Sequence, residues 1–316
     1  MTTFRIERFG FDPASRRNAC RASMTAIGRF APVAALVLAM AMGAAGQEPR
    51  PSVVAAENFY GDIARQIGGD RVDVASILSN PDQDPHLFET TPTIVRQIAA
   101  ARIVIFNGAD YDAWMDKLLK AAPRVGRTVL AVAELVNKKA GDNPHLWYDP
   151  ATMPTVARAL ADAFSKADPA HATDYAARLE TLLASLERIG GKVEEIRAKY
   201  AGVAITATEP VFGYMASALG LRVRNERLQM AVMNDTEPSA RDIAAFEQDL
   251  KEHRVRVLLY NKQTGTKLTQ RMLEIARRAK IPVVGVTETE PMGMTYQDWM
   301  LMQLAELQNA LAQPST

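Results

Sequence analysis

Residues 52–69, SVVAAENFYGDIARQIGG, decide the fold class because their hydrophobic pattern changes from that of a strand to that of a helix. The apolar run at the start is typical of a buried strand. Phe59, Ile63 and Ile67 then recur at helical spacing, and a glycine pair at 68–69 ends the helix. A buried strand that leads directly into an amphipathic helix is the unit of parallel α/β sheets.

Similar strand and helix patterns alternate through both halves of the chain. In the first half, further strands are expected at 72–78, 102–108 and 128–132, with helices at 91–101 and 112–122. In the second half, strands are expected at 202–208, 222–225, 255–261 and 281–286, with helices at 212–220, 239–253 and 269–280. This alternation predicts an α/β protein of two lobes, each with a parallel sheet flanked by helices.

One long helical segment, 169–200, separates the two halves. Its apolar residues are spaced by three or four, and as a helix it would extend about 45 Å. We therefore expect an amino-terminal lobe at 47–168, a linking helix at 169–200 and a carboxyl-terminal lobe at 201–316. A rigid helix between the lobes predicts limited hinge motion.

Residues 1–46 have the pattern of an export signal. Arginines precede the apolar run APVAALVLAMAMGAA, and small residues precede Gln47. The run is short for a membrane span, although a membrane anchor is the alternative. We expect cleavage near residue 46 and a periplasmic location. The only cysteine, Cys20, would be lost on cleavage, so disulfides and thiolate ligands are not expected.

Composition argues against binding to nucleic acid. Residues 1–46 contain six arginines and two acidic residues, so 31 basic and 34 acidic residues remain after cleavage, a net charge of −3. Proteins that hold polyanions carry an excess of basic residues.

Two short stretches with the same pattern indicate a metal site. The chain has four histidines, and two of them stand in DPHLFET at 84–90 and NPHLWYD at 143–149. Each stretch is expected between a strand and a helix, and the proline before each histidine stiffens the turn. Either histidine alone would be an ordinary loop residue. The repeated context predicts that His86 and His145 share one metal ion.

The second half offers acidic residues as further ligands. Glu209 and Glu288 each follow an apolar strand-like run, where the carboxyl ends of parallel strands meet. Either acid alone would normally be a helix cap or a turn residue. Glu290 competes with Glu288, because it lies two residues further on and on the same side of an extended chain.

Four motifs carry a family resemblance that covers residues 51–312. They are NPDQDPHLFETTP at 80–92, NPHLWYDP at 143–150, TEPVFGYMASALGL at 208–221 and VVGVTET at 283–289. Together they resemble the zinc- and manganese-binding solute receptors of bacterial ABC importers. The resemblance implies two lobes joined by one long helix, with a metal ion in the cleft between them. It also implies the ligands His86, His145, Glu209 and Glu288, and delivery by a monomeric receptor to an ABC membrane permease.

The cargo stays open between manganese and zinc. Many zinc receptors of this family have a His- and acid-rich loop before the second ligand and a histidine as the third ligand. Here the loop is only NKKAGD at 137–142, and the third position is Glu209. Two imidazoles and two carboxylates favour Mn²⁺ or ferrous iron more than three imidazoles do, yet Zn²⁺ binds such ligands more tightly than Mn²⁺.

Two other functions remain as alternatives. An exported zinc metallohydrolase needs an open coordination position and a nearby base, and the helical signature H-E-x-x-H is absent. Four protein ligands would also leave little room for a reactive water, so no enzymatic activity is expected. A receptor for a small organic solute is the other alternative, and it predicts that chelators do not destabilise the protein.

Overall fold

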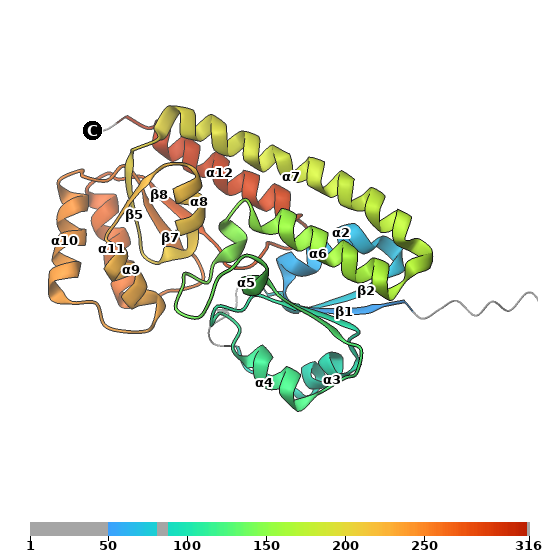
Figure 1. Cartoon of the computed structure of the whole chain (residues 1–316). Coiled ribbons are helices and arrows are strands. Elements are labelled where there is room, and N and C mark those ends of the chain that lie inside the picture. Colours follow the sequence, from blue (N-terminus) through green and yellow to red (C-terminus); the bar gives the residue numbers. More distant parts are fainter. Residues whose placement is uncertain (1–49, 81–87, 315–316) are drawn as a thin grey trace, which may run out of the picture. The chain divides into compact units, whose positions relative to one another are not determined.

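Two four-stranded sheets form the framework of the protein (Figure 1). The computed structural model describes residues 50–80 and 88–314. The strands of the first sheet are β1 (Ser52–Glu57), β2 (Asp73–Leu78), β3 (Ile103–Phe106) and β4 (Thr128–Ala131). Those of the second are β5 (Ala204–Ala207), β6 (Arg222–Arg224), β7 (Leu258–Asn261) and β8 (Val283–Val286).

Both sheets are parallel and have the same strand order. The orders are β2-β1-β3-β4 and β6-β5-β7-β8, so in each sheet the first strand in the chain is central. Strands β1, β3 and β5 are almost entirely buried, because helices cover both faces of a parallel sheet. The α/β class with two parallel sheets is therefore confirmed.

Helices connect the strands in both halves. In the first half they are α2 (Asn58–Gly68), α3 (Pro92–Ala100), α4 (Trp114–Ala121), α5 (Val132–Leu135) and α6 (Thr152–Ala167). The long helix is α7 (Ala172–Tyr200), and the second half adds α8 (Gly213–Ala218), α9 (Glu226–Met233), α10 (Ala240–Lys251), α11 (Lys267–Arg278) and α12 (Tyr296–Ala312). The 3-10 turns are η1 (Gly69–Arg71), η3 (Leu146–Tyr148), η4 (Pro169–His171) and η5 (Pro210–Phe212).

The long helix is present and slightly shorter than the sequence predicts. Pro169 opens the separate 3-10 turn η4, and α7 then continues for 29 residues to Tyr200, through the glycine pair at 190–191. Its buried stripe packs against α2, α6 and α12. Figure 1 shows α12 running alongside α7. Helices α6 and α12 were not singled out in the sequence, so α7 is one of several elements that join the two halves.

The largest of three apolar clusters extends across both sheets. This cluster of buried side chains includes Ile105 of β3 and Ile205 of β5, together with Trp147 and Trp299. Rotation of one sheet relative to the other would expose part of this cluster to water, at about 25 cal/mol for each Å² of apolar surface. This shared core gives the expected limited hinge motion a physical basis.

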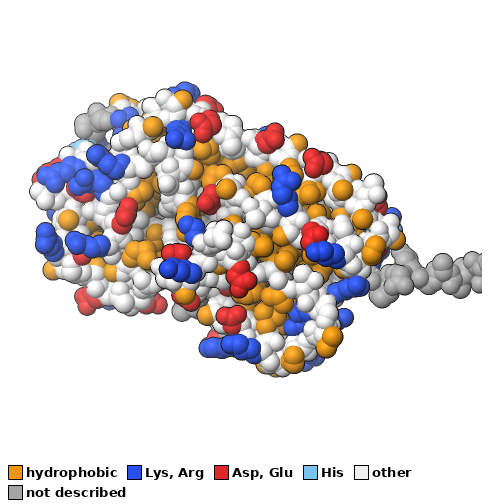
Figure 2. All heavy atoms as spheres, in the orientation of Figure 1, with side chains coloured by type: hydrophobic (Ala, Val, Ile, Leu, Met, Phe, Trp, Pro, Cys, Tyr) orange, Lys and Arg blue, Asp and Glu red, His pale blue; other side chains and the backbone are white. Residues whose placement is uncertain are grey.

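The surface has mixed charge. Figure 2 shows acidic and basic side chains interspersed over one face of the protein. Glu247 on α10, for example, forms ion pairs with Lys251 and Arg271. Among the residues that the structure describes, none of the helices has the length and apolarity needed to cross a membrane.

Candidate metal centre

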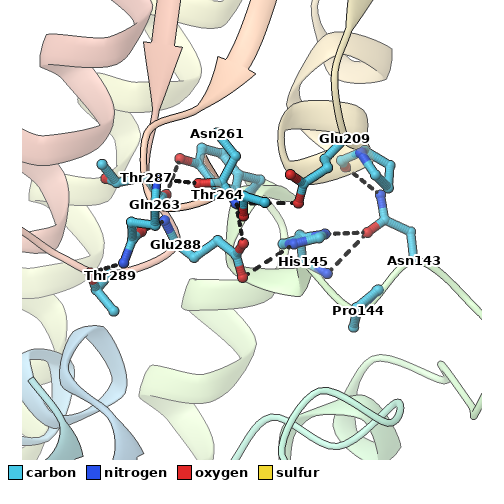
Figure 3. A network of polar contacts seen from close by, with 12 residues as sticks. Asn143, Pro144, His145, Glu209, Asn261, Gln263, Thr264, Thr287, Glu288 and Thr289 are labelled. Carbon is cyan, nitrogen blue, oxygen red and sulfur yellow. Dashed lines mark hydrogen bonds and ion pairs between the residues drawn. The ribbon is translucent and has the colours of Figure 1, made fainter. Parts of the chain in front are cut away.

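Three neighbouring strands bring polar side chains to one edge of the second sheet (Figure 3). Glu209 follows β5 by two residues, Glu288 follows β8 by two residues, and Asn261 ends β7, which lies between them. These three side chains are 4%, 0% and 1% exposed, respectively. Carboxyl ends of adjacent parallel strands lie together, which explains how residues so distant in sequence meet.

The amide group of Asn261 contacts both carboxylates. Its Nδ2 lies 2.5 Å from Glu288 Oε1 and 3.3 Å from Glu209 Oε2. Its Oδ1 accepts a hydrogen bond from the backbone N–H of Gln263 at 3.0 Å. Because that N–H can only donate, the bond fixes which end of the amide faces the acids.

His145 approaches this pair from the other half of the chain. Its Nδ1 lies 2.7 Å from Asn143 Oδ1, while Asn143 Nδ2 donates to the carbonyl of Pro210 at 2.8 Å. Since Oδ1 of Asn143 is an acceptor, Nδ1 of His145 donates to it, and Nε2 is the ring nitrogen that faces the carboxylates. Nε2 makes no hydrogen bond within the described chain and lies 3.5 Å from Glu288 Oε2.

Aromatic side chains surround the imidazole. Tyr111 and Trp147 meet its ring edge to face, with centroids 6.1 Å and 5.3 Å away. Burial raises the pKa of Tyr111 well above its ordinary value, and the negative charge of Glu288 raises it further. Two carboxylates in so apolar a setting strongly favour a cation beside them, because burying an uncompensated charge is costly.

The turn that contains His145 is hydrogen-bonded to both acid-bearing loops. Tyr148 Oη donates to the carbonyl of Thr287, the residue before Glu288, at 2.7 Å. Asn143 reaches Pro210, the residue after Glu209, and Tyr214 Oη donates to the Asn143 carbonyl at 2.8 Å. These bonds position the imidazole and both carboxylates relative to one another.

The structure describes three of the four predicted metal ligands. His145, Glu209 and Glu288 lie close together, whereas His86 falls outside the described residues. Glu290 lies elsewhere: its backbone N–H donates to Asn58 Oδ1, and Asn58 Nδ2 donates to its carbonyl. Burial and the charge of Asp62 raise the pKa of Glu290 to about 9. The geometry therefore separates Glu288 from its competitor.

The described residues alone do not form a complete ligand set. In this part of the chain, no three His, Cys, Asp or Glu side chains are grouped closely enough to hold a metal ion. The Asn261 amide bonds to both carboxylates, and a fourth predicted ligand, His86, is not described. The described part of the candidate site thus consists of one imidazole and two carboxylates.

Sequence reasoning missed the residues that support this cluster. Asn261 is the clearest case, because it ends an apolar strand as Glu209 and Glu288 nearly do, yet an amide at that position does not by itself indicate a metal site. Asn143 and Tyr148 belong to the quoted histidine stretch NPHLWYD, but only the histidine was interpreted. The sequence feature that indicates Asn261 is a polar residue at the end of a buried strand, where binding sites of parallel sheets lie.

Two further buried acids lie at the edge of the first sheet. Glu57 ends β1 and is 0% exposed, and Asp112 is 1% exposed. Burial raises the pKa of Glu57 well above its ordinary value, and the charge of Asp112 raises it further. Burial also raises the pKa of Asp112, to about 6, although the backbone N–H groups of Asn107 and Gly108 donate to it.

These raised pKa values predict that the metal-free protein loses stability as pH rises. The folded state keeps protons that the unfolded chain releases above its ordinary carboxyl pKa, near 4. Glu57→Gln should remove part of this dependence, up to about 1.4 kcal/mol per pH unit for one proton. Urea unfolding of the chelated protein between about pH 5 and about pH 7 measures the slope. Parallel profiles for the variant and the unmodified protein would contradict the assignment.

Known proteins resemble this chain in sequence. The family model described as "Zinc-uptake complex component A periplasmic" matches residues 53–310. The chain is 26% identical over 214 residues to the iron ABC transporter substrate-binding lipoprotein MtsA of Streptococcus pyogenes serotype M1, covering 62% of this chain and 68% of MtsA. It is 26% identical over 208 residues to the manganese ABC transporter substrate-binding lipoprotein PsaA of Streptococcus anginosus, covering 58% and 66%.

A solved structure has the same fold. The periplasmic zinc-binding protein TroA from Treponema pallidum superposes with a TM-score of 0.70 at 19% identity, covering 84% of this chain and all of that one. At this identity the likeness shows the fold alone. The family match, in contrast, spans most of the sequence, and the chain therefore belongs to the family of zinc-uptake complex component A periplasmic proteins.

Proposed function

We propose that this protein is an extracytoplasmic receptor that captures a divalent transition-metal ion and delivers it to the membrane permease of an ABC importer. The observation that carries the proposal is the position of His145 Nε2, which lies 3.5 Å from Glu288 Oε2 in a fully buried setting. A dication beside an imidazole nitrogen and a carboxylate oxygen is attracted to both of them, and the attraction is strong where water is excluded.

The proposed ligands are His86, His145, Glu209 and Glu288. Two negative charges offset the charge of a dication, so the ion can leave water without a large unpaired charge. Relatives in the comparisons are named for iron, manganese and zinc, which agrees with a mixed imidazole and carboxylate set. We assign Mn²⁺ or Zn²⁺ as the cargo.

The remaining assignments complete this proposal. Residues 1–46 direct export and are removed, so the mature receptor works in the periplasm as a monomer. Transport requires capture and release rather than bond cleavage, and four protein ligands leave little room for a reactive water. The protein is therefore not an enzyme in this proposal.

Metal binding should stabilise the protein strongly. Protein purified without added ions is analysed for metal, stripped with a chelator and titrated with Zn²⁺ or Mn²⁺. An ion at 100 times its dissociation constant adds about 2.7 kcal/mol, which raises the Tm by about 5–10 °C for a protein of this size. A Tm that responds to neither chelator nor ions, but rises with an organic solute, would support the alternative receptor. Metal-dependent hydrolysis by the loaded protein would support the metallohydrolase.

A further inference from the structure

Asn58, the first residue of α2, contacts the loop that carries Glu288 from the opposite half of the chain. Its Nδ2 donates to the carbonyl of Glu290 at 2.7 Å, and its Oδ1 accepts from the backbone N–H of Glu290 at 3.1 Å. Because a carbonyl can only accept and a backbone N–H can only donate, these two bonds fix the orientation of the amide. The side chain thus pairs with the main chain of Glu290 as a neighbouring strand would.

This paired contact lies in the interior of the protein. Asn58 is 8% exposed, Glu290 is 6% exposed, and Glu288 is fully buried. Water therefore has little access to the two bonds and cannot readily replace them. A buried main-chain group that loses its hydrogen-bond partner is unfavourable, so the loop is expected to keep its pairing with Asn58.

Glu288 lies between two contacts with the first half of the chain. On one side, Tyr148 Oη donates at 2.7 Å to the carbonyl of the residue before Glu288. On the other side, Asn58 pairs with Glu290. Tyr148 belongs to the 3-10 turn that follows His145, so the first contact comes from the turn of the imidazole itself. The second contact comes from a different element, α2, and adds a separate constraint on the loop.

We propose, on the basis of the proposed function, that Asn58 is a positioning residue of the metal centre. Gln263 Oε1 accepts from the Glu288 N–H at 2.5 Å and fixes the loop to its own half of the chain. Asn58 fixes the same loop to the other half, which also carries His145. The carboxylate and the imidazole then stay within reach of one ion. Asn58 acts through the main chain of Glu290 and is not itself a ligand.

Asn58→Ala removes both bonds to the loop. It should lower the affinity of the chelated protein for Zn²⁺ and for Mn²⁺ by about 10- to 100-fold, the usual scale for residues that orient metal ligands. Titration well below the unfolding temperature of the variant measures this loss. Asn58→Gln keeps a donor and an acceptor on a longer side chain and should recover part of the affinity. Asn58→Ser retains a polar group that is too short for the paired bonds, and it is measured, with the same expected loss, if the alanine variant does not fold.

Gln66→Ala is the matched control on the same helix. Gln66 also forms a paired amide contact with the other half, because Gln66 and Gln297 each donate from Nε2 to the other's Oε1 at 2.9 Å. This contact lies further along α2 and reaches α12 instead of the loop of Glu288. A merely structural role predicts that Asn58→Ala and Gln66→Ala lower both the Tm and the affinity to a similar extent. The positioning role predicts that Gln66→Ala lowers the Tm and keeps the affinity.

The outcomes separate this inference from the proposed function. Unchanged affinity in Asn58→Ala, or an equal loss of affinity in Gln66→Ala, would overturn the role of Asn58. If the unmodified protein binds neither Zn²⁺ nor Mn²⁺, the proposed function itself fails.

Discussion

Glu288→Ala lowers the affinity for both Zn²⁺ and Mn²⁺ by at least about 100-fold, because it removes a direct ligand and residues that merely orient ligands already change affinity 10- to 100-fold. The same replacement takes away the carboxylate that Asn261 holds at 2.5 Å and that faces His145 Nε2 at 3.5 Å. Titration of the chelated protein, followed by metal analysis of the purified variant, measures the loss.

Glu290→Gln is the matched control for this experiment. Glu290 is the same residue type two positions further on, and it is buried against Asn58 and Asp62 instead of the imidazole. Its pKa of about 9 means that it is protonated at neutral pH, so glutamine is a close substitute. We expect this variant to bind metal as the unmodified protein does. Loss of binding in Glu290→Gln with retention in Glu288→Ala would exchange the two assignments.

Trp299→Ala is expected to give the largest loss of stability, about 3–5 kcal/mol, as is usual when a buried aromatic side chain is truncated. Trp299 is fully buried on α12 and contacts the rings of Phe59 and Tyr148 from the other half of the chain. Its Nε1 also donates to Thr287 Oγ1 at 3.1 Å, next to Glu288. The side chain therefore contacts both halves beside the candidate metal centre.

Thermal and urea unfolding measure this loss. Because one core crosses both sheets, we expect the variant to unfold in a single transition at a lower temperature. Val125→Ala is the control, since Val125 is fully exposed and its truncation leaves no cavity. Two separate transitions in Trp299→Ala would show that the halves are stabilised independently.

The fold was largely predictable because its signals are local. The strand-to-helix change at 52–69 appears as β1 followed directly by α2, and the apolar spacing of 169–200 appears as α7. Helix α12 was missed because it has buried residues around most of its surface, including the polar Gln297 and Gln303, which obscures a one-sided apolar pattern. Its place between the halves depends on contacts that no local pattern specifies.

The site was predictable to a smaller extent. His145, Glu209 and Glu288 were predicted because ionisable groups in turns that follow strands are conspicuous, and the structure places Glu288 beside His145 and both acids beside Asn261. Asn261 was not identified, because an amide at a strand end has many ordinary roles. Its importance depends on two carboxylates that lie 52 and 27 positions away in sequence. Only the three-dimensional arrangement of β5, β7 and β8 reveals that connection.

The common core has a consequence for any attempt to divide this polypeptide. Helix α7 buries its apolar stripe against α2, and α12, from the opposite end of the sequence, also packs against α2. A fragment that stops before α7 would leave the covering of α2 and α6 incomplete and would expose side chains such as Phe59 and Phe164. We therefore expect that neither half folds by itself, and separately expressed halves should aggregate unless they are produced together.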